Sequence, residues 1–296
     1  MRKNFFGSMI AIAAMAVCAT SCGGNSSNAE SNGADSTIVV NAKCDGVSEV
    51  LLDSVTVLYT LQDNAGEHRM PNSLFYGVDN KDSARVEELS PSGSVASSIH
   101  CFLMEKEGKK VLFDTGIGEK AGGCLLARLD SIGVAPDDID YLLITHFHND
   151  HIGGMLRGDS VVFPNAEVYV PEVEYAYWAK SGEKGENAMK TMKAYGDKLH
   201  QFSFTDSTAL PLGIKAMAAM GHTPGHALYM SGRLLVIADL VHGYDLQVQD
   251  MNICPAYDMN PVQAVESRKF FFGFAERKKL VMAGMHMPGN GILINK

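Results

Sequence analysis

Three histidines and one aspartate fall within residues 146–151, directly after the apolar run 141–144. Neutral imidazole and carboxylate are ligands that suit zinc and its neighbours, and bonds of about 2.0–2.2 Å require them to converge on one point. Packed together without a cation, these groups would repel one another if charged and would be poorly hydrogen-bonded if buried. The segment therefore predicts a metal site, and the chain has to fold around it.

The spacing within this segment indicates two metal ions rather than one. His146 and His148 lie two residues apart, so at the end of an extended strand they project to the same side. The adjacent Asp150 and His151 must diverge in direction. One pair can therefore serve one ion and the other pair a second.

Three more candidate ligands lie further along the chain, each after a predicted strand: His222, Asp239 and His286. Side chains at strand ends in one layered sheet structure can all face one rim, where binding sites in open sheets commonly lie. A single histidine at a strand end is more often hydrogen-bonded or solvated than bound to a metal. The case for His222 and His286 thus depends on the cluster at 146–151.

Hydrophobic patterning places these candidates in an α/β fold. Runs rich in β-branched and aromatic residues, bounded by turn residues, predict strands. They lie at 55–61, 98–105, 109–114, 141–145, 166–170, 214–219, 227–230 and 234–238, with a last strand leading into His286. Helical spacing predicts helices at 119–132, 173–180, 187–202 and 261–278. Two rounds of strands followed by a helix predict layers in the order helix, sheet, sheet, helix.

Together with the predicted strand and turn at 111–116, these residues resemble the metallo-β-lactamase-fold hydrolase superfamily over roughly residues 55–296. The resemblance implies a four-layer αββα sandwich that holds two zinc ions. It implies one zinc ion held by His146, His148 and His222, and another held by Asp150, His151 and His286. In this arrangement Asp239 bridges the two ions.

The residues around these ligands narrow the resemblance to one branch. True β-lactamases of the superfamily usually lack a bridging aspartate at the position of Asp239, and flavoprotein relatives have glutamate at the position of His148. The residues most similar to the branch with quorum-quenching lactonases and methyl parathion hydrolase are 238–242, Gln247, Asp258, Arg268 and 286–291. Lactonases of that branch often have a catalytic tyrosine where this chain has His242, which moves the resemblance toward organophosphate hydrolases.

The resemblance implies a zinc-dependent hydrolase that cleaves an ester, lactone or phosphotriester-like bond with a metal-bridging hydroxide. Asp150 is the candidate to orient that hydroxide and to pass a proton to the leaving group. His242 either donates a hydrogen bond to the substrate or fixes Asp239. Two alternatives remain open: a thioester hydrolase resembling glyoxalase II, although the basic tail expected for it is lacking, and a non-catalytic zinc-binding lipoprotein.

The first residues predict a targeting segment. Arg2 and Lys3 precede an apolar run at 5–19 that is too short for a normal membrane span of about 20 residues, and a sequence resembling a lipobox ends at Cys22. We expect a lipoprotein signal peptide at 1–21, a flexible tether at 22–37 and a catalytic domain at 38–296. The expected location is the bacterial cell envelope, on the periplasmic or outer-membrane face, with lipid anchorage at Cys22. A cleavage site at Cys18 and a buried N-terminal helix are the alternatives.

Charge and composition restrict the partners. Loss of Arg2 and Lys3 with the signal peptide moves the formal net charge from −9 to −11, and no basic block with interleaved aromatics occurs. A small-molecule substrate is therefore expected and a nucleic acid is not. The pairing of the remaining cysteines, Cys44, Cys101, Cys124 and Cys254, stays open.

Two aromatic segments have two interpretations each. The Phe-rich run at 270–274 fits either the core or a homodimer face. The aromatic residues at 175–178 fit the core or the mouth of a substrate site. Substrate specificity is expected to reside in loops such as 175–186 and 243–257.

Overall fold

The structure is a computed structural model that describes residues 38–79, 83–206 and 210–295. The signal peptide and tether expected at 1–37, and the anchor at Cys22, lie outside these residues and stay predictions. Within the three described ranges, we find no helix with the length and apolar character needed to cross a bilayer.

The first sheet has eight strands in the order β1-β2-β3-β7-β8-β9-β12-β13. Their bounds are β1 Val39–Cys44, β2 Val47–Leu51, β3 Thr56–Gln62, β7 His100–Lys106, β8 Lys109–Phe113, β9 Tyr141–Leu143, β12 Glu167–Pro171 and β13 Leu199–Phe202. The strands from β1 to β8 pair antiparallel, whereas β8, β9, β12 and β13 run parallel to one another. The carboxyl ends of β8 and β9 therefore meet at one edge of the sheet.

The second sheet has five strands in the order β14-β15-β16-β18-β19. They are β14 Lys215–Ala218, β15 Ala227–Ser231, β16 Leu234–Val236, β18 Val281–Ala283 and β19 Ile292–Ile294. All neighbours are antiparallel except β16 and β18, which are parallel. This parallel pair also ends at a common edge.

The two sheets pack face to face because successive side chains of a strand point to opposite faces. On β7, Phe102 and Met104 join an apolar cluster that also contains Tyr229 and Val236 of the second sheet. Leu103, between them, belongs to a different cluster. A one-residue shift in register would exchange these two faces, so the alternation fixes which side of β7 meets the second sheet.

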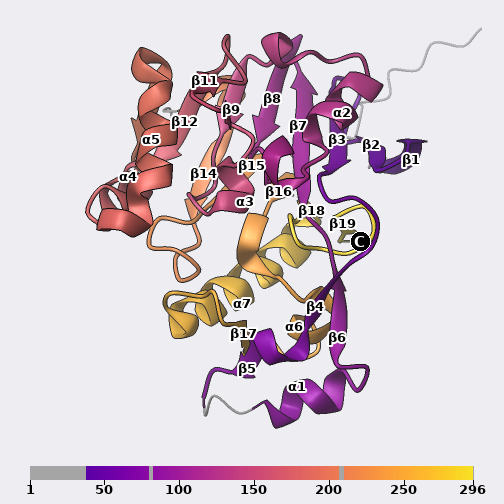
Figure 1. The fold of residues 1–296 in the computed structure, drawn as a ribbon. Helices are drawn as coiled ribbons and strands as arrows, with labels where there is room; N and C mark the ends of the chain where they lie inside the picture. Colours follow the sequence, from indigo (N-terminus) through magenta and orange to yellow (C-terminus); the bar gives the residue numbers. More distant parts are fainter. Residues whose placement is uncertain (1–37, 80–82, 207–209, 296) are drawn as a thin grey trace, which may run out of the picture. The chain divides into compact units, whose positions relative to one another are not determined.

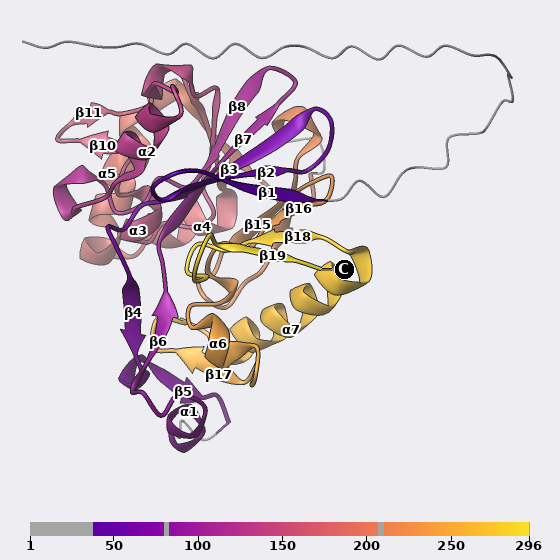
Figure 2. The same cartoon turned by 90° about the vertical axis from the view of Figure 1, so that its right-hand side faces the viewer.

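The α-helices of the described residues are α1 Ala84–Leu89, α2 Leu125–Ser131, α3 Asn149–Ile152, α4 Glu172–Trp178, α5 Glu186–Ala194, α6 Tyr244–Gln247 and α7 Pro261–Lys278. Some of them cover the outer faces of the two sheets. Leu129 of α2 and Met192 of α5 pack in the cluster with Leu103, and Phe271 of α7 packs with Leu235 and Met282 of the second sheet. Figure 2 shows α7 along the second sheet, on the side away from α2 and α5. The predicted αββα order is therefore confirmed.

An arm of short elements extends from one edge of the sandwich (Figure 1). It contains the strand pair β4 His68–Pro71 and β6 Ser94–Ser97, the pair β5 Phe75–Gly77 and β17 Ile253–Pro255, and helices α1 and α6. Its own small core includes Met70, Phe75 and Leu246. The hydrophobic pattern predicted none of these elements.

Two predicted helices were only partly correct. The helix expected at 119–132 begins only at Leu125, because Gly122 at φ 89° breaks it after a short 3-10 turn. The helix expected at 187–202 ends at Ala194, and its last residues form β13 instead. Phe202 is buried in the inter-sheet core, and this tertiary contact outweighs local helix propensity.

Candidate metal centre

The candidate ligands follow strands that end at the shared edge of the two sheets. His146 to His151 come after β9, and Asp114 comes after its parallel neighbour β8. Asp239 follows β16 and His286 follows its parallel neighbour β18. His222 lies in the loop between β14 and β15. Backbone pairing of Ala227 N with Thr145 O, at 3.0 Å, ties the two sheets together beside the site.

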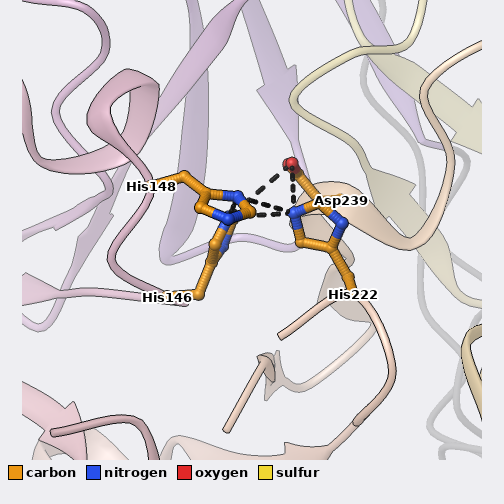
Figure 3. A group of neighbouring side chains, drawn as sticks. All are labelled: His146, His148, His222 and Asp239. Atoms are coloured by element: carbon orange, nitrogen blue, oxygen red, sulfur yellow. Dashed lines mark hydrogen bonds and ion pairs between the residues drawn. The ribbon is translucent and has the colours of Figure 1, made fainter. Parts of the chain in front are cut away.

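A first cluster consists of His146, His148 and His222 (Figure 3). The Nε2 atoms of His146 and His222 lie 3.2 Å apart, and they lie 3.0 and 2.9 Å from His148 Nδ1. Tetrahedral zinc with bonds of about 2.0–2.1 Å separates its ligand atoms by about 3.3 Å. The spacing of these three nitrogens is thus close to that of a zinc site.

A second cluster consists of Asp150, His151 and His286. His286 Nε2 lies 3.4 Å from Asp150 Oδ2, and the side chain of His151 is completely buried. The side chain of Asp150 is 32% exposed, whereas no side chain of a buried ligand here exceeds 8%. Each cluster therefore has one partly exposed ligand, His148 in the first and Asp150 in the second.

Asp239 lies between the clusters. Its Oδ2 is 3.2 Å from His222 Nε2 and 3.4 Å from His286 Nε2, while its Oδ1 is 2.9 Å from His151 Nε2. The preceding residue, Ala238, has a left-handed φ of 41°, a strained conformation for a residue with a side chain. The turn after β16 therefore carries backbone strain where it brings this carboxylate between the clusters.

Three of the imidazoles face Asp239 with Nε2 and have an acceptor within hydrogen-bond distance of Nδ1. His151 Nδ1 contacts Asp114 Oδ2 at 2.8 Å, His222 Nδ1 contacts Asp258 Oδ1 at 3.0 Å, and His286 Nδ1 contacts the Ser98 carbonyl at 2.9 Å. A carboxylate or carbonyl partner keeps the proton on Nδ1. The Nε2 atoms that face Asp239 therefore carry lone pairs in the neutral tautomers.

Lone pairs facing a buried carboxylate need a positive charge between them. His151 Nε2 and Asp239 Oδ1 are both buried and make no hydrogen bond, although they lie 2.9 Å apart. Burial alone would lower the pKa of His222 and of His286, but Asp239 with its neighbouring carboxylates raises them to about 9 and about 10. The carboxylates thus make the centre attractive to protons or metal ions, and the donor set of imidazole and carboxylate fits zinc.

His242 lies against both Asp239 and the second cluster. Its Nε2 is 3.1 Å from Asp239 Oδ2, and its ring stacks on His286 with centroids 4.9 Å apart. Gln247 Oε1 accepts the His242 backbone N–H at 2.7 Å, which fixes the turn. Burial lowers the pKa of His242 to about 4, so the ring is neutral at physiological pH. Its Nδ1 is buried without a hydrogen-bond partner.

A cavity of about 500 Å³ opens onto both clusters. His148, Asp150, His222, Asp239, His242 and His286 line its floor. Its walls come from the arm and from two loops: residues 68–71, Leu74, Ile99, Asn149 and Tyr257. A small molecule with an apolar part can therefore reach the clusters from the side of the arm.

The sequence model of the Metallo-beta-lactamase superfamily matches residues 95–268, which is more than half of the chain. The chain belongs to the metallo-beta-lactamase superfamily. An N-acyl homoserine lactonase of Bacillus sp is 26% identical over 160 residues, which cover 47% of this chain and 60% of that protein. The chain thus matches less than two thirds of the length of that lactonase.

Solved structures of superfamily members share the fold. The hydrolase AbOPH has a TM-score of 0.73 and 26% identity, covering 86% of this chain and 94% of that one. AidC, a dizinc quorum-quenching lactonase in complex with a product, has a TM-score of 0.74 and 24% identity, covering 84% and 93%. The predicted relationship to this superfamily and to lactonase-like members is confirmed.

In this superfamily member, the structure brings together all seven residues that the sequence singled out as ligands, together with His242. His226 lies apart from the cavity: Asp239 N donates to its Nε2 at 3.4 Å, and its Nδ1 contacts the Ala219 carbonyl. It therefore helps to hold the backbone of Asp239.

The aromatic residues at 175–178 do not line the cavity. Tyr177 is exposed, Tyr175 packs against the core, and the buried Trp178 packs edge-on against His148 with centroids 5.8 Å apart. Of the two alternatives for 175–178, the core therefore fits Tyr175 and Trp178. No residue of 175–186 lines this cavity, whereas Tyr257 of the loop 243–257 does. The arm supplies the wall instead.

Two side chains near the centre were missed by sequence reasoning. Glu174 is fully buried and binds the loops that carry the first cluster. His68 of the arm lines the cavity, and its pKa is lowered by burial and by the nearby His286. A glutamate on an amphipathic helix and a histidine in a short strand give no sequence signal of this kind.

The run at 270–274 has a mixed environment. Phe271 is buried in the core beneath the second sheet, while Phe270 is 59% exposed. The homodimer face stays a prediction. Among the described residues, Cys44, Cys101, Cys124 and Cys254 are free thiols.

Proposed function

We propose that this chain is a dizinc hydrolase that cleaves an ester, lactone or phosphotriester-like bond of a small molecule. His146, His148 and His222 would hold one ion, Asp150, His151 and His286 would hold the other, and Asp239 lies between the two sets. The single observation that carries the proposal is the cavity of about 500 Å³, which joins an apolar wall to the two clusters.

Two zinc ions at such a centre supply a water nucleophile at neutral pH and a Lewis acid for a carbonyl or phosphoryl oxygen. The residues of the chain have to orient the substrate and move protons. Asp150 suits the proton transfer because its side chain lines the cavity and is 32% exposed. It takes up the proton of the nucleophile and delivers it to the leaving group.

His242 is proposed to contact the substrate. Its side chain lines the cavity with Nε2 3.1 Å from Asp239 Oδ2 and its ring stacked on His286, so a substrate bound at both clusters would lie against this ring. Relatives described as lactonases make an acyl ester or lactone the first substrate class to assay.

The proposal extends to the part of the chain before residue 38. A lipid anchor at Cys22 would hold the catalytic domain at the bacterial cell envelope, on the periplasmic or outer-membrane face. Metabolic labelling with a fatty-acid analogue tests this, because Cys22→Ser would abolish labelling and Cys18→Ser would not.

Metal content and hydrolysis should be measured on the full-length protein purified in detergent, with aryl esters, lactones and phosphotriesters as substrates. We expect about two zinc ions per chain and turnover that a chelator abolishes and zinc restores. His148→Ala should lose both one metal equivalent and activity, while the surface variant His200→Ala should keep them. Two zinc ions without turnover on any of the three classes would refute the proposed reaction, and a protein without bound zinc would refute the metal centre.

A further inference from the structure

Glu174 of α4 is a buried carboxylate that lies outside both clusters. Its side chain is 0% exposed, and its oxygens accept four hydrogen bonds from three separate segments. Burial of an isolated charge is costly unless it is paired or well hydrogen-bonded. A carboxylate in this position therefore needs all of its partners.

Three of the four partners lie in the two loops that carry the first cluster. Oε1 accepts the backbone N–H of Phe147 at 3.0 Å, between His146 and His148. Oε2 accepts the hydroxyl of Thr223 at 2.8 Å and the backbone N–H of Gly225 at 2.9 Å, in the loop of His222. One carboxylate thus links the loop after β9 to the loop between β14 and β15.

The fourth partner connects Glu174 to the third imidazole. Trp178 Nε1 donates to Oε1 at 2.6 Å, and the indole ring packs edge-on against His148 with centroids 5.8 Å apart. The contact between α4 and the second loop is also close, because a Cβ at Gly225 would lie 2.3 Å from Glu174 N. Only glycine lets the loop approach the start of the helix this closely.

We propose that Glu174 is the positioning residue of the first cluster, a single carboxylate that sets the two histidine loops at the separation a metal ion requires. The inference rests on the proposed metal centre. It assigns Glu174 no contact with metal or substrate. Its effect is to preorganise His146, His148 and His222, so that less ordering accompanies metal binding.

The chemistry of the partners makes glutamine a sharp test. Two backbone amides and an indole are donors only, and they face both ends of the carboxylate. Glutamine has the same shape, but one end becomes an NH₂ group that must face a donor. Glu174→Gln therefore breaks the link to one of the two loops without opening a cavity.

The variant should weaken metal binding at the first cluster and leave the second cluster unchanged. Competition titration with a chromophoric chelator on the full-length protein in detergent should show one of two zinc classes weakened about 10–100-fold. Glu172→Gln, on the same helix but exposed, should leave both classes as in the wild type. Thr223→Val, which removes one hydroxyl donor and keeps the carboxylate, should give a smaller effect. Equal weakening of both classes, or none, would overturn the proposal.

A second readout separates this inference from the proposed function. Amide hydrogen exchange in the metal-free protein should accelerate at Phe147 or at Gly225 in Glu174→Gln, whichever faces the new NH₂ group, but not at Thr115, whose N–H donates to His151 O at 2.7 Å. Wild-type protein that binds no zinc would refute the metal centre, and exchange would still decide the link between the loops. Unchanged exchange at both amides would refute the role of Glu174, even with two zinc ions bound.

Discussion

The two clusters of the metal centre differ in how firmly the protein holds them. In the first, three imidazole nitrogens lie 2.9–3.2 Å apart, and two buried carboxylates, Glu174 and Asp258, support their loops. In the second, the buried Asp114 supports His151, His286 is held by a backbone carbonyl, and Asp150 stands on the short helix α3 with a side chain that is 32% exposed. The first cluster thus has one more supporting carboxylate, Glu174, and this carboxylate joins two of its loops.

In the proposed metal centre, this difference would let the first cluster retain its ion while Asp150 of the second faces the substrate. A site that is rigid before metal arrives spends little free energy on ordering its ligands. A ligand that faces a cavity can exchange a proton with a substrate there. We therefore expect the ion of the first cluster to be held more tightly than the ion of the second.

The largest effect is expected from Asp239→Ala, because this residue faces both clusters. Its two oxygens lie 3.2 Å from His222 Nε2 and 2.9 Å from His151 Nε2. We expect both zinc equivalents to be lost at micromolar free zinc. The loss of affinity should exceed the factor of about 10–100 that is typical when a residue hydrogen-bonded to a metal ligand is removed. Elemental analysis after dialysis measures this. Full retention of two zinc ions would break the comparison, since the clusters would then not share a ligand.

Asp258→Asn should act on the first cluster alone. An amide in place of the Asp258 carboxylate can donate to His222 Nδ1, which would move the ring proton to the nitrogen that faces His146 and His148. We expect the tighter zinc class to weaken by up to about 100-fold while the weaker class stays unchanged. A chelator titration that shows the weaker class shifted instead would invert the assignment of affinities.

Asp114→Asn is the converse test, with a smaller expected effect. Asp114 Oδ2 contacts His151 Nδ1 at 2.8 Å, and Oδ1 accepts the Thr145 N–H, a bond that the amide oxygen of asparagine can keep. The weaker zinc class should lose about tenfold in affinity. If the same titration shows the tighter class weakened equally, Thr145 transmits the change to His146, and the two clusters are less independent than their geometry indicates.

Much of the centre could be predicted from sequence because its ligands directly follow apolar strands. Helix α7 was predicted with its observed bounds: Asn260 caps it, Pro261 begins it, and Val265 and Phe271 lie on its buried face. The order of layers followed from the same patterns. What the sequence shows well is local periodicity and the residues that end it.

The arm and the role of Glu174 could not be predicted for two physical reasons. Strands β4, β5, β6 and β17 have three or four residues each, too few to show an alternation. The partners of Glu174 include the backbone amides of Phe147 and Gly225, which lie 27 and 51 residues away. Every non-proline residue has such an amide, so nothing in the sequence marks these two.

The smallest effect is expected from His68→Asn, which tests the accessible side of the centre without changing a ligand. His68 lines the cavity from the arm, and the proximity of His286 and burial lower its pKa, so it is neutral near pH 7. A neutral imidazole can form one hydrogen bond with a substrate, worth about 0.5–1.5 kcal/mol. Losing this bond should raise KM about 2- to 10-fold. Steady-state kinetics on an aryl ester should show this change in KM, with kcat and both zinc equivalents unaltered.

His200→Asn, the same substitution on the surface, should leave KM unchanged. If His68→Asn instead releases zinc from the second cluster, the arm supports the metal rather than the substrate, and the second cluster is held from more sides than its own ligands indicate.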